Sequence, residues 1–227
     1  MTRRNIFRQG GPYWKIIIHF KKLNSFNNQI KLHQKILFLY LLDNHIKMSK
    51  VENLVNSVEI SRGSYIQTIG KLSKDVANHK PNKSSWNIVE ITEHLYWAEF
   101  LGVAVMAKVL NEILDGKREQ KYESKNKGLT IEKVVELTWN QKEKVPDIAA
   151  PRVRGSITFW INSLVSLNSI LTEFTNNLTD DMLRVIAHAH PISGELDFQQ
   201  RLEFLRFHID RHHLQAKRNI KDFKELK

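Results

Sequence analysis

The amino-acid sequence predicts an all-α protein, a four-helix bundle with a long crossover connection and one short extra helix. Four long stretches repeat apolar residues at spacings of three and four, the period of an amphipathic helix. No alternating apolar and polar pattern typical of a strand occurs at any length. About 40 residues separate the second stretch from the third, far more than antiparallel neighbours need. The second and third long helices are therefore expected to run in the same direction.

The first two long helices are expected at 51–79 and from Asn87 to 114. Gly63 interrupts the apolar pattern of the first helix, and Pro81 follows its end. The second helix opens with a capping box, in which the side chains of Asn87 and Glu90 can satisfy free backbone N–H groups. The apolar positions of the two helices include Val51, Val58, Tyr65, Ile69, Ile88, Ile91, Leu95 and Val109.

The third and fourth long helices are expected at 156–177 and 197–223. Asp197 and Gln200 form a second capping box at the start of the fourth helix. The composition of residues 190–194 (HPISG) indicates a turn just before it. The short extra helix is expected at 130–140, inside the crossover, because a polar stretch precedes it and Pro146 follows it.

Most of the positive charge lies in the first 47 residues. They hold nine Lys or Arg residues against one acid, Asp43, and so carry +8 of the net charge of +11, which leaves +3 for residues 48–227. Three interpretations of 1–47 stay open: upstream sequence read in frame before a true start at Met48, a disordered basic arm that touches nucleic acid or anionic lipid, or a short extra helix at 28–42. The domains expected are thus a basic extension, 1–47, and a bundle, 48–227.

Several classes of protein are excluded by composition. The chain has no cysteine, so it has no disulfide, no Cys-ligated zinc and no thiol nucleophile of its own. The apolar run at 36–42 is too short to span a bilayer, which needs about 20 residues, and its flanks do not fit a signal peptide. No glycine-rich phosphate loop and no G-x-S-x-G elbow occurs. We expect a cytoplasmic protein without a membrane span.

Three histidines are candidate metal ligands. His208 and His212 are four positions apart within a predicted helix, so they lie on one face and can reach one ion. His94, one position before core residue Leu95, supplies a third imidazole. By spacing alone, histidines in helices are more often surface or core residues than ligands.

Residues near these histidines in sequence are candidates to orient their rings. Glu90 lies one turn before His94, and Gln215 lies nearly one turn after His212. Glu90 can equally be a capping residue only. We expect Glu93, Asp210 and Arg211 to be solvated charges, and consider Trp97, Trp160 and Phe207 as pocket walls, although aromatic residues at helical spacing usually form core.

Three separated motifs resemble those of one family. Residues 86–95 (WNIVEITEHL) are similar to the W-S-x-x-E-x-x-x-H-L signature of the DinB/YfiT-like superfamily, with Asn87 in place of the usual serine. Residues 190–196 (HPISGEL) resemble its H-P-x-x-G-x-L turn, and residues 205–215 (LRFHIDRHHLQ) resemble its last helix with the H-x-x-x-H-x-x-Q pattern. The resemblance covers about 50–224 and no part of 1–47.

The resemblance implies a four-helix bundle of up-down-down-up course with a metal held by His94, His208 and His212. It also implies a homodimer, since many members form dimers. The metal is one divalent transition ion, zinc, nickel or iron, because imidazole ligands suit each of them. Three protein ligands leave a position open, as in catalytic zinc sites.

The family's chemistry is diverse, and the fold does not choose among its reactions. The first hypothesis is a metal-dependent transferase that joins a low-molecular-weight thiol, such as bacillithiol, to an electrophilic small-molecule substrate. The second is a metal-dependent hydrolase that uses metal-bound hydroxide. A third, of another class, is a non-enzymatic basic protein that binds nucleic acid, against which the +3 charge of 48–227 argues. A fourth is a bundle whose site is only structural.

Overall fold

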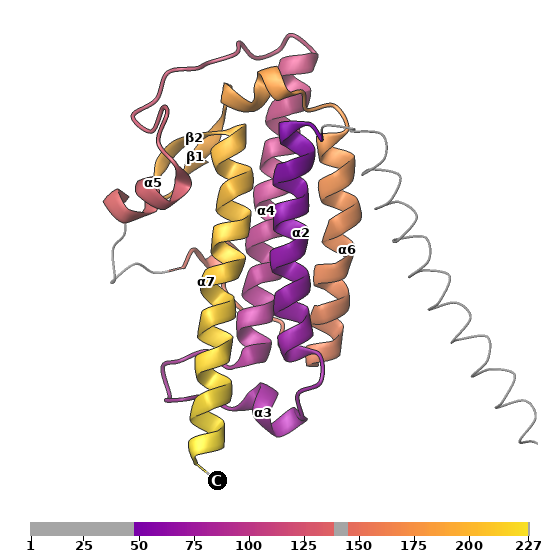
Figure 1. Ribbon diagram of the computed structural model, residues 1–227, viewed down its shortest axis with the longest axis vertical. Helices are drawn as coiled ribbons and strands as arrows, with labels where there is room; N and C mark the ends of the chain where they lie inside the picture. The colour runs from indigo at the N-terminus through magenta and orange to yellow at the C-terminus, as the bar shows by residue number, and fades with distance from the viewer. Residues whose placement is uncertain (1–47, 139–144, 227) are drawn as a thin grey trace, which may run out of the picture. The chain divides into compact units, whose positions relative to one another are not determined.

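The computed structural model of the chain describes residues 48–138 and 145–226 (Figure 1). The chain divides into two compact units, Met1–Met48 and Ser49–Lys227, and the described residues other than Met48 belong to the second. The expectations for 1–47 therefore lie outside the described residues, as does the end of the short helix expected at 130–140.

Four long helices build the second unit. They are α2 (Lys50–Ile69), α4 (Ile88–Leu114), α6 (Ile157–Thr175) and α7 (Phe198–Glu225), and they lie side by side (Figure 1). The prediction of an all-α protein is confirmed. No helix in the described part of the chain is long and apolar enough to cross a membrane.

The helices follow the course that the long crossover predicts. Tyr65, near the end of α2, is hydrogen-bonded to Thr92, near the start of α4, so these two helices are antiparallel. Val89 and Trp160, each near the start of its helix, share an apolar cluster, so α4 and α6 are parallel. Figure 1 shows α7 running in the direction of α2. The order is thus up-down-down-up.

The first helix is shorter than expected. It ends at Ile69, not at His79, because Gly70 follows it and a new helix begins shortly afterwards. That helix, α3 (Lys74–Asn78), is capped by the hydroxyl of Ser73. An N-cap side chain in the middle of an apolar pattern is the local signal that the pattern contains two helices rather than one.

A short hairpin precedes the last helix. The strands β1 (Ile186–His190) and β2 (Gly194–Asp197) pair antiparallel, although the sequence shows no strand pattern. Exposed and buried residues do not alternate strictly along either strand, so the period used to recognise strands is absent. The turn expected at 190–194 joins the strands, and Gly194 has a φ of 73°, which favours glycine.

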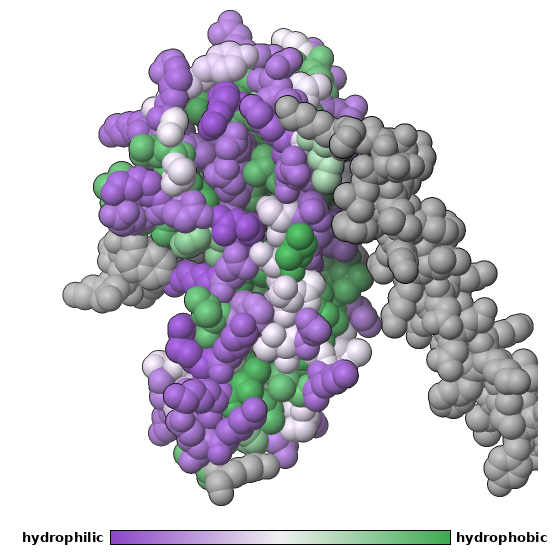
Figure 2. All heavy atoms as spheres, viewed as in Figure 1, coloured by the Kyte–Doolittle hydropathy of each residue, from purple (hydrophilic) through white to green (hydrophobic). Residues whose placement is uncertain are grey.

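The remaining elements surround the bundle's core. They are α5 (Ile131–Thr138), which is the short extra helix, and the 3-10 turns η1 (Asp147–Ala149) and η2 (Asp180–Arg184). One cluster of buried aliphatic and aromatic side chains runs between the four long helices, while hydrophilic residues cover most of the face drawn in Figure 2. Both predicted capping boxes, at the starts of α4 and α7, are present.

Candidate metal centre

Three histidine side chains from two helices meet at one point. His94 lies on α4, and His208 and His212 lie one turn apart on α7. The Nε2 atom of His208 lies 3.1 Å from Nε2 of His94 and 3.2 Å from Nε2 of His212. One ring nitrogen of each residue lies within 4.8 Å of the others, so the three could hold one metal ion.

Hydrogen bonds at the far side of two rings fix which nitrogen faces the centre. Nδ1 of His94 donates to the carbonyl oxygen of Ala149 at 2.8 Å, and Nδ1 of His212 donates to Oε1 of Gln215 at 2.8 Å. Each of these neutral rings therefore presents a bare Nε2 to the centre. His208 carries at most one proton on Nε2, so it can donate a hydrogen bond to the Nε2 atom of His94 or of His212 but not to both. A cation between the three nitrogens would satisfy all of them, so the donor set fits a metal ion.

Burial keeps the three rings neutral. Desolvation is the largest cause that lowers the pKa of each histidine, and for His212 the pKa falls to about 3. For His208 the neighbouring rings of His212 and His94 lower the pKa further. A neutral imidazole carries the lone pair that a metal ligand needs, so the site is competent at neutral pH.

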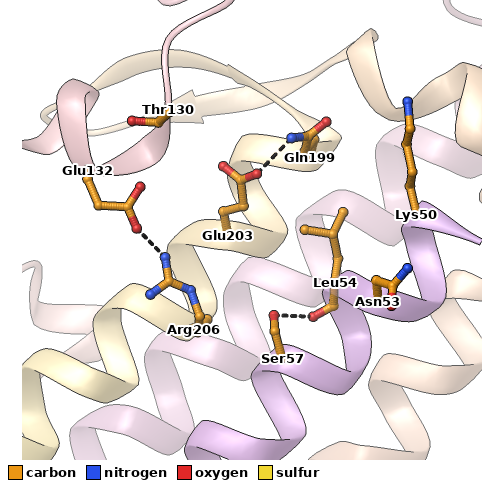
Figure 3. Close-up of a pocket in the computed structure, with 9 residues that line it drawn as sticks. All are labelled: Lys50, Asn53, Leu54, Ser57, Thr130, Glu132, Gln199, Glu203 and Arg206. Atoms are coloured by element: carbon orange, nitrogen blue, oxygen red, sulfur yellow. Dashed lines mark hydrogen bonds and ion pairs between the residues drawn. The ribbon is translucent and has the colours of Figure 1, made fainter.

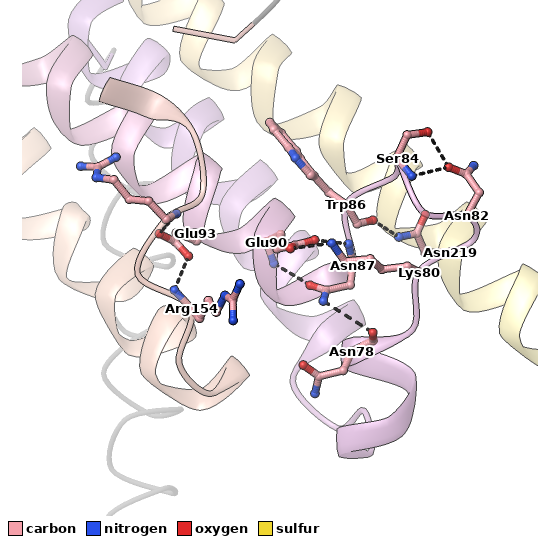
Figure 4. Close-up of polar contacts among 11 residues, drawn as sticks. Asn78, Lys80, Asn82, Ser84, Trp86, Asn87, Glu90, Glu93, Arg154 and Asn219 are labelled. Carbon is pink, nitrogen blue, oxygen red and sulfur yellow. Dashed lines mark hydrogen bonds and ion pairs between the residues drawn. The ribbon is translucent and has the colours of Figure 1, made fainter. Parts of the chain in front are cut away.

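Two aromatic side chains flank the histidines. The Trp86 ring lies 4.9 Å from the His94 ring and stacks on His212 with 6.4 Å between centroids. Its backbone is held by Asn219, which donates from Nδ2 to the Trp86 carbonyl (Figure 4). On the other side, Phe204 stacks on His208 at 5.8 Å. These rings restrict the histidines and exclude water from their flanks.

Glu93 holds the crossover segment that orients His94. Its carboxylate accepts three backbone N–H groups, from residues Arg152, Val153 and Arg154, at 2.6–2.9 Å. Figure 4 shows the bond from Arg154. The same segment carries the carbonyl of Ala149. The expectation that Glu93 is a solvated charge is wrong: its side chain is fully buried, because the N–H groups of the crossover replace water as its partners.

The two residues suggested as orienting partners make different contacts. Oε1 of Gln215 lies 2.8 Å from Nδ1 of His212. Glu90 accepts the N–H of Asn87 and pairs with Lys80, so it is engaged as a capping residue, and the Ala149 carbonyl occupies the Nδ1 atom of His94 instead. Glu90 lies in the first turn of α4, where a free backbone N–H group binds its carboxylate. It is therefore not available to His94, although its spacing in the sequence would allow a contact.

Most of the other residues named from the sequence lie away from the centre. Arg211 is the exception, because its charge helps to lower the pKa of all three histidines. Among the described residues, no ring contact joins Trp97, Trp160 or Phe207 to the three histidines. The two tryptophans pack on each other at 6.1 Å, and Phe207 packs beside the cluster of α5 and β2. Asp210 pairs with a neighbouring arginine on α7, and Arg211 is exposed, as expected of solvated charges.

Sequence reasoning did not find Ala149 or Phe204. A backbone carbonyl leaves no mark in the sequence, so no signal identifies Ala149. Phe204 lies four positions before His208 and therefore on the same helix face, which is a signal that the spacing offers.

A separate surface pocket of about 410 Å³ lies between α2, α5 and α7 (Figure 3). It contains none of the three histidines, and polar side chains dominate its lining. Arg206 pairs with Glu132 across it, and Gln199 donates to Glu203. Because these groups satisfy one another, the pocket offers less to a ligand than the histidine centre does.

Comparison with known proteins agrees with this centre. The model of the DinB superfamily matches residues 58–216, which include all three histidines. The chain belongs to the DinB superfamily. Among solved structures, a conserved protein from Enterococcus faecalis matches with a TM-score of 0.46 and 11% identity, over 78% of this chain and 98% of that one. No curated protein matches. The three motifs noted in the sequence all fall inside the DinB superfamily match.

Proposed function

We propose that this DinB superfamily protein is a metal-dependent enzyme that joins a low-molecular-weight thiol to an electrophilic small molecule. The observation that carries the proposal is the convergence of three neutral imidazoles, two of them with a bare Nε2 fixed by hydrogen bonds at Nδ1. Three protein ligands leave room for an exchangeable one, as catalytic sites require. Zinc, nickel and iron all suit such ligands.

A divalent ion in this site would lower the pKa of a thiol or a water that it binds, and so supply a nucleophile at neutral pH. In the thiol reaction, the thiol releases its proton to solvent, its sulfur bonds to the electrophilic carbon, and the displaced group leaves with the electrons of the bond that breaks. The chain's own residues hold the ion, through His94, His208 and His212, and keep water from the flanks of the rings through Trp86 and Phe204.

The engagement of nearby carboxylates favours thiol transfer over hydrolysis, the second candidate. Hydrolysis benefits from a general acid or base that moves protons beside the nucleophile. Of the carboxylates on α4 beside His94, Glu90 caps the helix and Glu93 accepts three backbone N–H groups. Neither is available in this arrangement to give a proton to a leaving amine or alkoxide, which hydrolysis of an amide or ester requires. Transfer of a thiol to a carbon that bears a good leaving group does not require such a proton.

Metal content is the first test. Elemental analysis of the purified protein should find about one equivalent of a transition metal, and His94→Ala and His208→Ala should lose it. His213→Ala is the matched control, because His213 lies next to His212 but is hydrogen-bonded to Thr68. Absence of metal after reconstitution with zinc, nickel and iron, or its retention in both site variants, would refute the proposal.

Assays of model electrophiles with and without added thiol then separate the two reactions. Thiol transfer requires the thiol and is lost in His208→Ala. Turnover that proceeds without thiol would favour the hydrolase. Metal binding without any turnover would leave a structural site.

Family resemblance also supports two proposals about the protein's state, a homodimer and a cytoplasmic location. Sedimentation of the purified protein tests the first, since a single monomeric species at micromolar concentration would contradict it. Fractionation of the native cells tests the second.

A further inference from the structure

A buried arginine without an ion-pair partner in the described structure lies on the same helix as two of the histidines. The side chain of Arg201 is 5% exposed, and its Nε and Nη1 atoms have no hydrogen-bond partner among the described residues. Burial lowers its pKa to about 10, so it remains charged at neutral pH. By contrast, Arg62, which is also buried, pairs with Glu99 and Asn168. An unpaired buried cation is costly, which indicates that Arg201 has a counter-ion in the working protein.

The surroundings of Arg201 contain polar nitrogens but no ion-paired carboxylate in the described part of the chain. His188 and His190, on β1, lie close enough for its charge to act on them. Burial first, and then the Arg201 charge, lower the pKa of both histidines to about 4, so both are neutral. Nε2 of His188 is also buried and makes no hydrogen bond of normal geometry with a described residue, although the backbone of Gly102 lies near enough to raise the pKa of His188. The positive charge is therefore not balanced by its neighbours.

The facing helix leaves space for the guanidinium group. Gly102 on α4 lies opposite Arg201, and a Cβ atom on this glycine would lie 3.4 Å from Nη2 of Arg201. Glycine is unfavourable inside a helix, so its presence here needs a local reason. With no side chain at this position, the guanidinium group can lie close to the backbone of α4.

One aromatic ring connects this arginine to the metal centre. Phe204 lies 5.7 Å from Cζ of Arg201 and 4.5 Å from the His190 ring, and it stacks on His208. Arg201 and His208 are two helical turns apart on one face of α7, a rise on the order of 10 Å. That separation suits two ends of one small molecule.

We propose that Arg201 binds an oxyanion, a carboxylate or a phosphate, on the molecule that reacts at the three-histidine centre. The guanidinium fork matches both groups with paired hydrogen bonds, and His188 offers a further polar contact. The proposal rests on the proposed function in one respect: it assigns an anionic group to the substrate or cosubstrate, on the order of 10 Å from its reacting atom.

Anion-dependent thermal unfolding of the full-length protein tests this proposal. The probes are acetate and inorganic phosphate, each compared with chloride at the same ionic strength. The variants are Arg201→Met, Arg201→Lys and, as a matched control, Arg218→Met, which removes the same charge from an exposed position of α7. His208→Ala is included because an anion could bind the metal instead, and this route is removed with the metal.

We expect acetate or phosphate at several times its dissociation constant to raise the Tm of the wild type by about 2–4 °C. His208→Ala and Arg218→Met should keep this rise, Arg201→Met should lose it, and Arg201→Lys should lose most of it. Without anion, the Tm of Arg201→Met should equal or exceed that of the wild type, because an unpaired charge is removed.

Three results would overturn the proposal: no rise with either anion, an equal rise in Arg201→Met, or a rise that disappears in His208→Ala. If Arg201→Met does not fold, Arg201→Lys carries the comparison alone. The rise in Tm of His208→Ala is measured in a protein without the metal. It therefore tests the anion site even if the metal centre proposed above is wrong. A response to only one anion assigns the oxyanion to that class.

Discussion

His94 and His212 are both fixed through Nδ1, but the acceptors differ in kind. His94 donates to the backbone carbonyl of Ala149, which no side-chain substitution removes, whereas His212 donates to the side chain of Gln215. A single substitution can therefore release the ring of His212 while leaving that of His94 in place. A substitution of Gln215 therefore tests the effect of ring orientation while all three histidines are still present.

Gln215→Leu should weaken metal binding by about 10–100-fold without removing a ligand. The substitution leaves Nδ1 of His212 without its acceptor, so both the tautomer and the ring orientation are less well fixed. Competition with a chelator measures the affinity. Gln199→Leu, on the same helix and bonded to Glu203, is the control and should bind metal as the wild type does. Equal affinity in both variants would contradict the role of Gln215.

The sequence predicts the three histidines of the centre but not all of their hydrogen-bond partners. The helical spacing of His208 and His212 allows a shared site, and the resemblance of three motifs to those of the DinB superfamily is what predicts that His94 joins them. The partners of those rings are less accessible. A carbonyl such as that of Ala149 depends on where the chain crosses over, and Glu93 shows that a charge flanking a ligand can be buried when distant N–H groups converge on it.

At the level of elements, the crossover is joined to α4 through one carboxylate. Glu93→Gln would remove the charge that strengthens three hydrogen bonds, and should lower the free energy of unfolding by about 2 kcal/mol. Because the same segment presents Ala149 to His94, metal affinity should fall as well. Chemical denaturation and chelator competition measure the two effects. Stability and affinity equal to those of the wild type would refute the coupling, and Glu119→Gln, at an exposed position, is the control.

The start of α2 is held by a residue distant in sequence. Both carboxylate oxygens of Asp180 accept backbone N–H groups, from Lys50 at 3.0 Å and Val51 at 3.1 Å, and these hydrogen bonds lower its pKa. A lowered folded-state pKa stabilises the protein above the unfolded value of about 4, and this contribution is lost as the pH falls through the folded pKa. The carboxylate thus ties α2 to the turn that follows α6.

Asp180→Ala should lower the Tm near neutral pH, and the difference from the wild type should disappear in strong acid. Thermal unfolding from pH 7 down to pH 2 measures it. Asp181→Ala removes an adjacent exposed charge and should show no such pattern. A difference that grows as the pH falls would have the wrong sign and would contradict the assignment.

The ends of helices are predicted well where residues close in sequence form a cap. The capping boxes at Asn87 and Asp197 locate the starts of α4 and α7, because side chains there bond to N–H groups three positions away. The hairpin at 186–197 is not predicted, since its short strands are defined by their pairing with each other and not by a period in the sequence. Tertiary contacts set such elements.

At the level of the whole molecule, the four long described helices enclose one core of buried side chains from residues 51–216. Every backbone N–H from Ser49 to Glu52 has a partner within 49–227. A protein spanning 48–227 should therefore keep the Tm of the full chain within about 2 °C and bind the same amount of metal. Side-by-side thermal unfolding and elemental analysis test this. A large loss of stability would assign a structural role to 1–47.

The up-down-down-up course also places the ligands far apart along the chain. His94 and His208 are separated by 114 positions, and the Ala149 carbonyl lies between them. The three imidazoles therefore meet only through long-range contacts, which form more slowly than local ones. An ion that binds the complete set of ligands, and not the folding transition state, would leave the folding rate unchanged and slow unfolding.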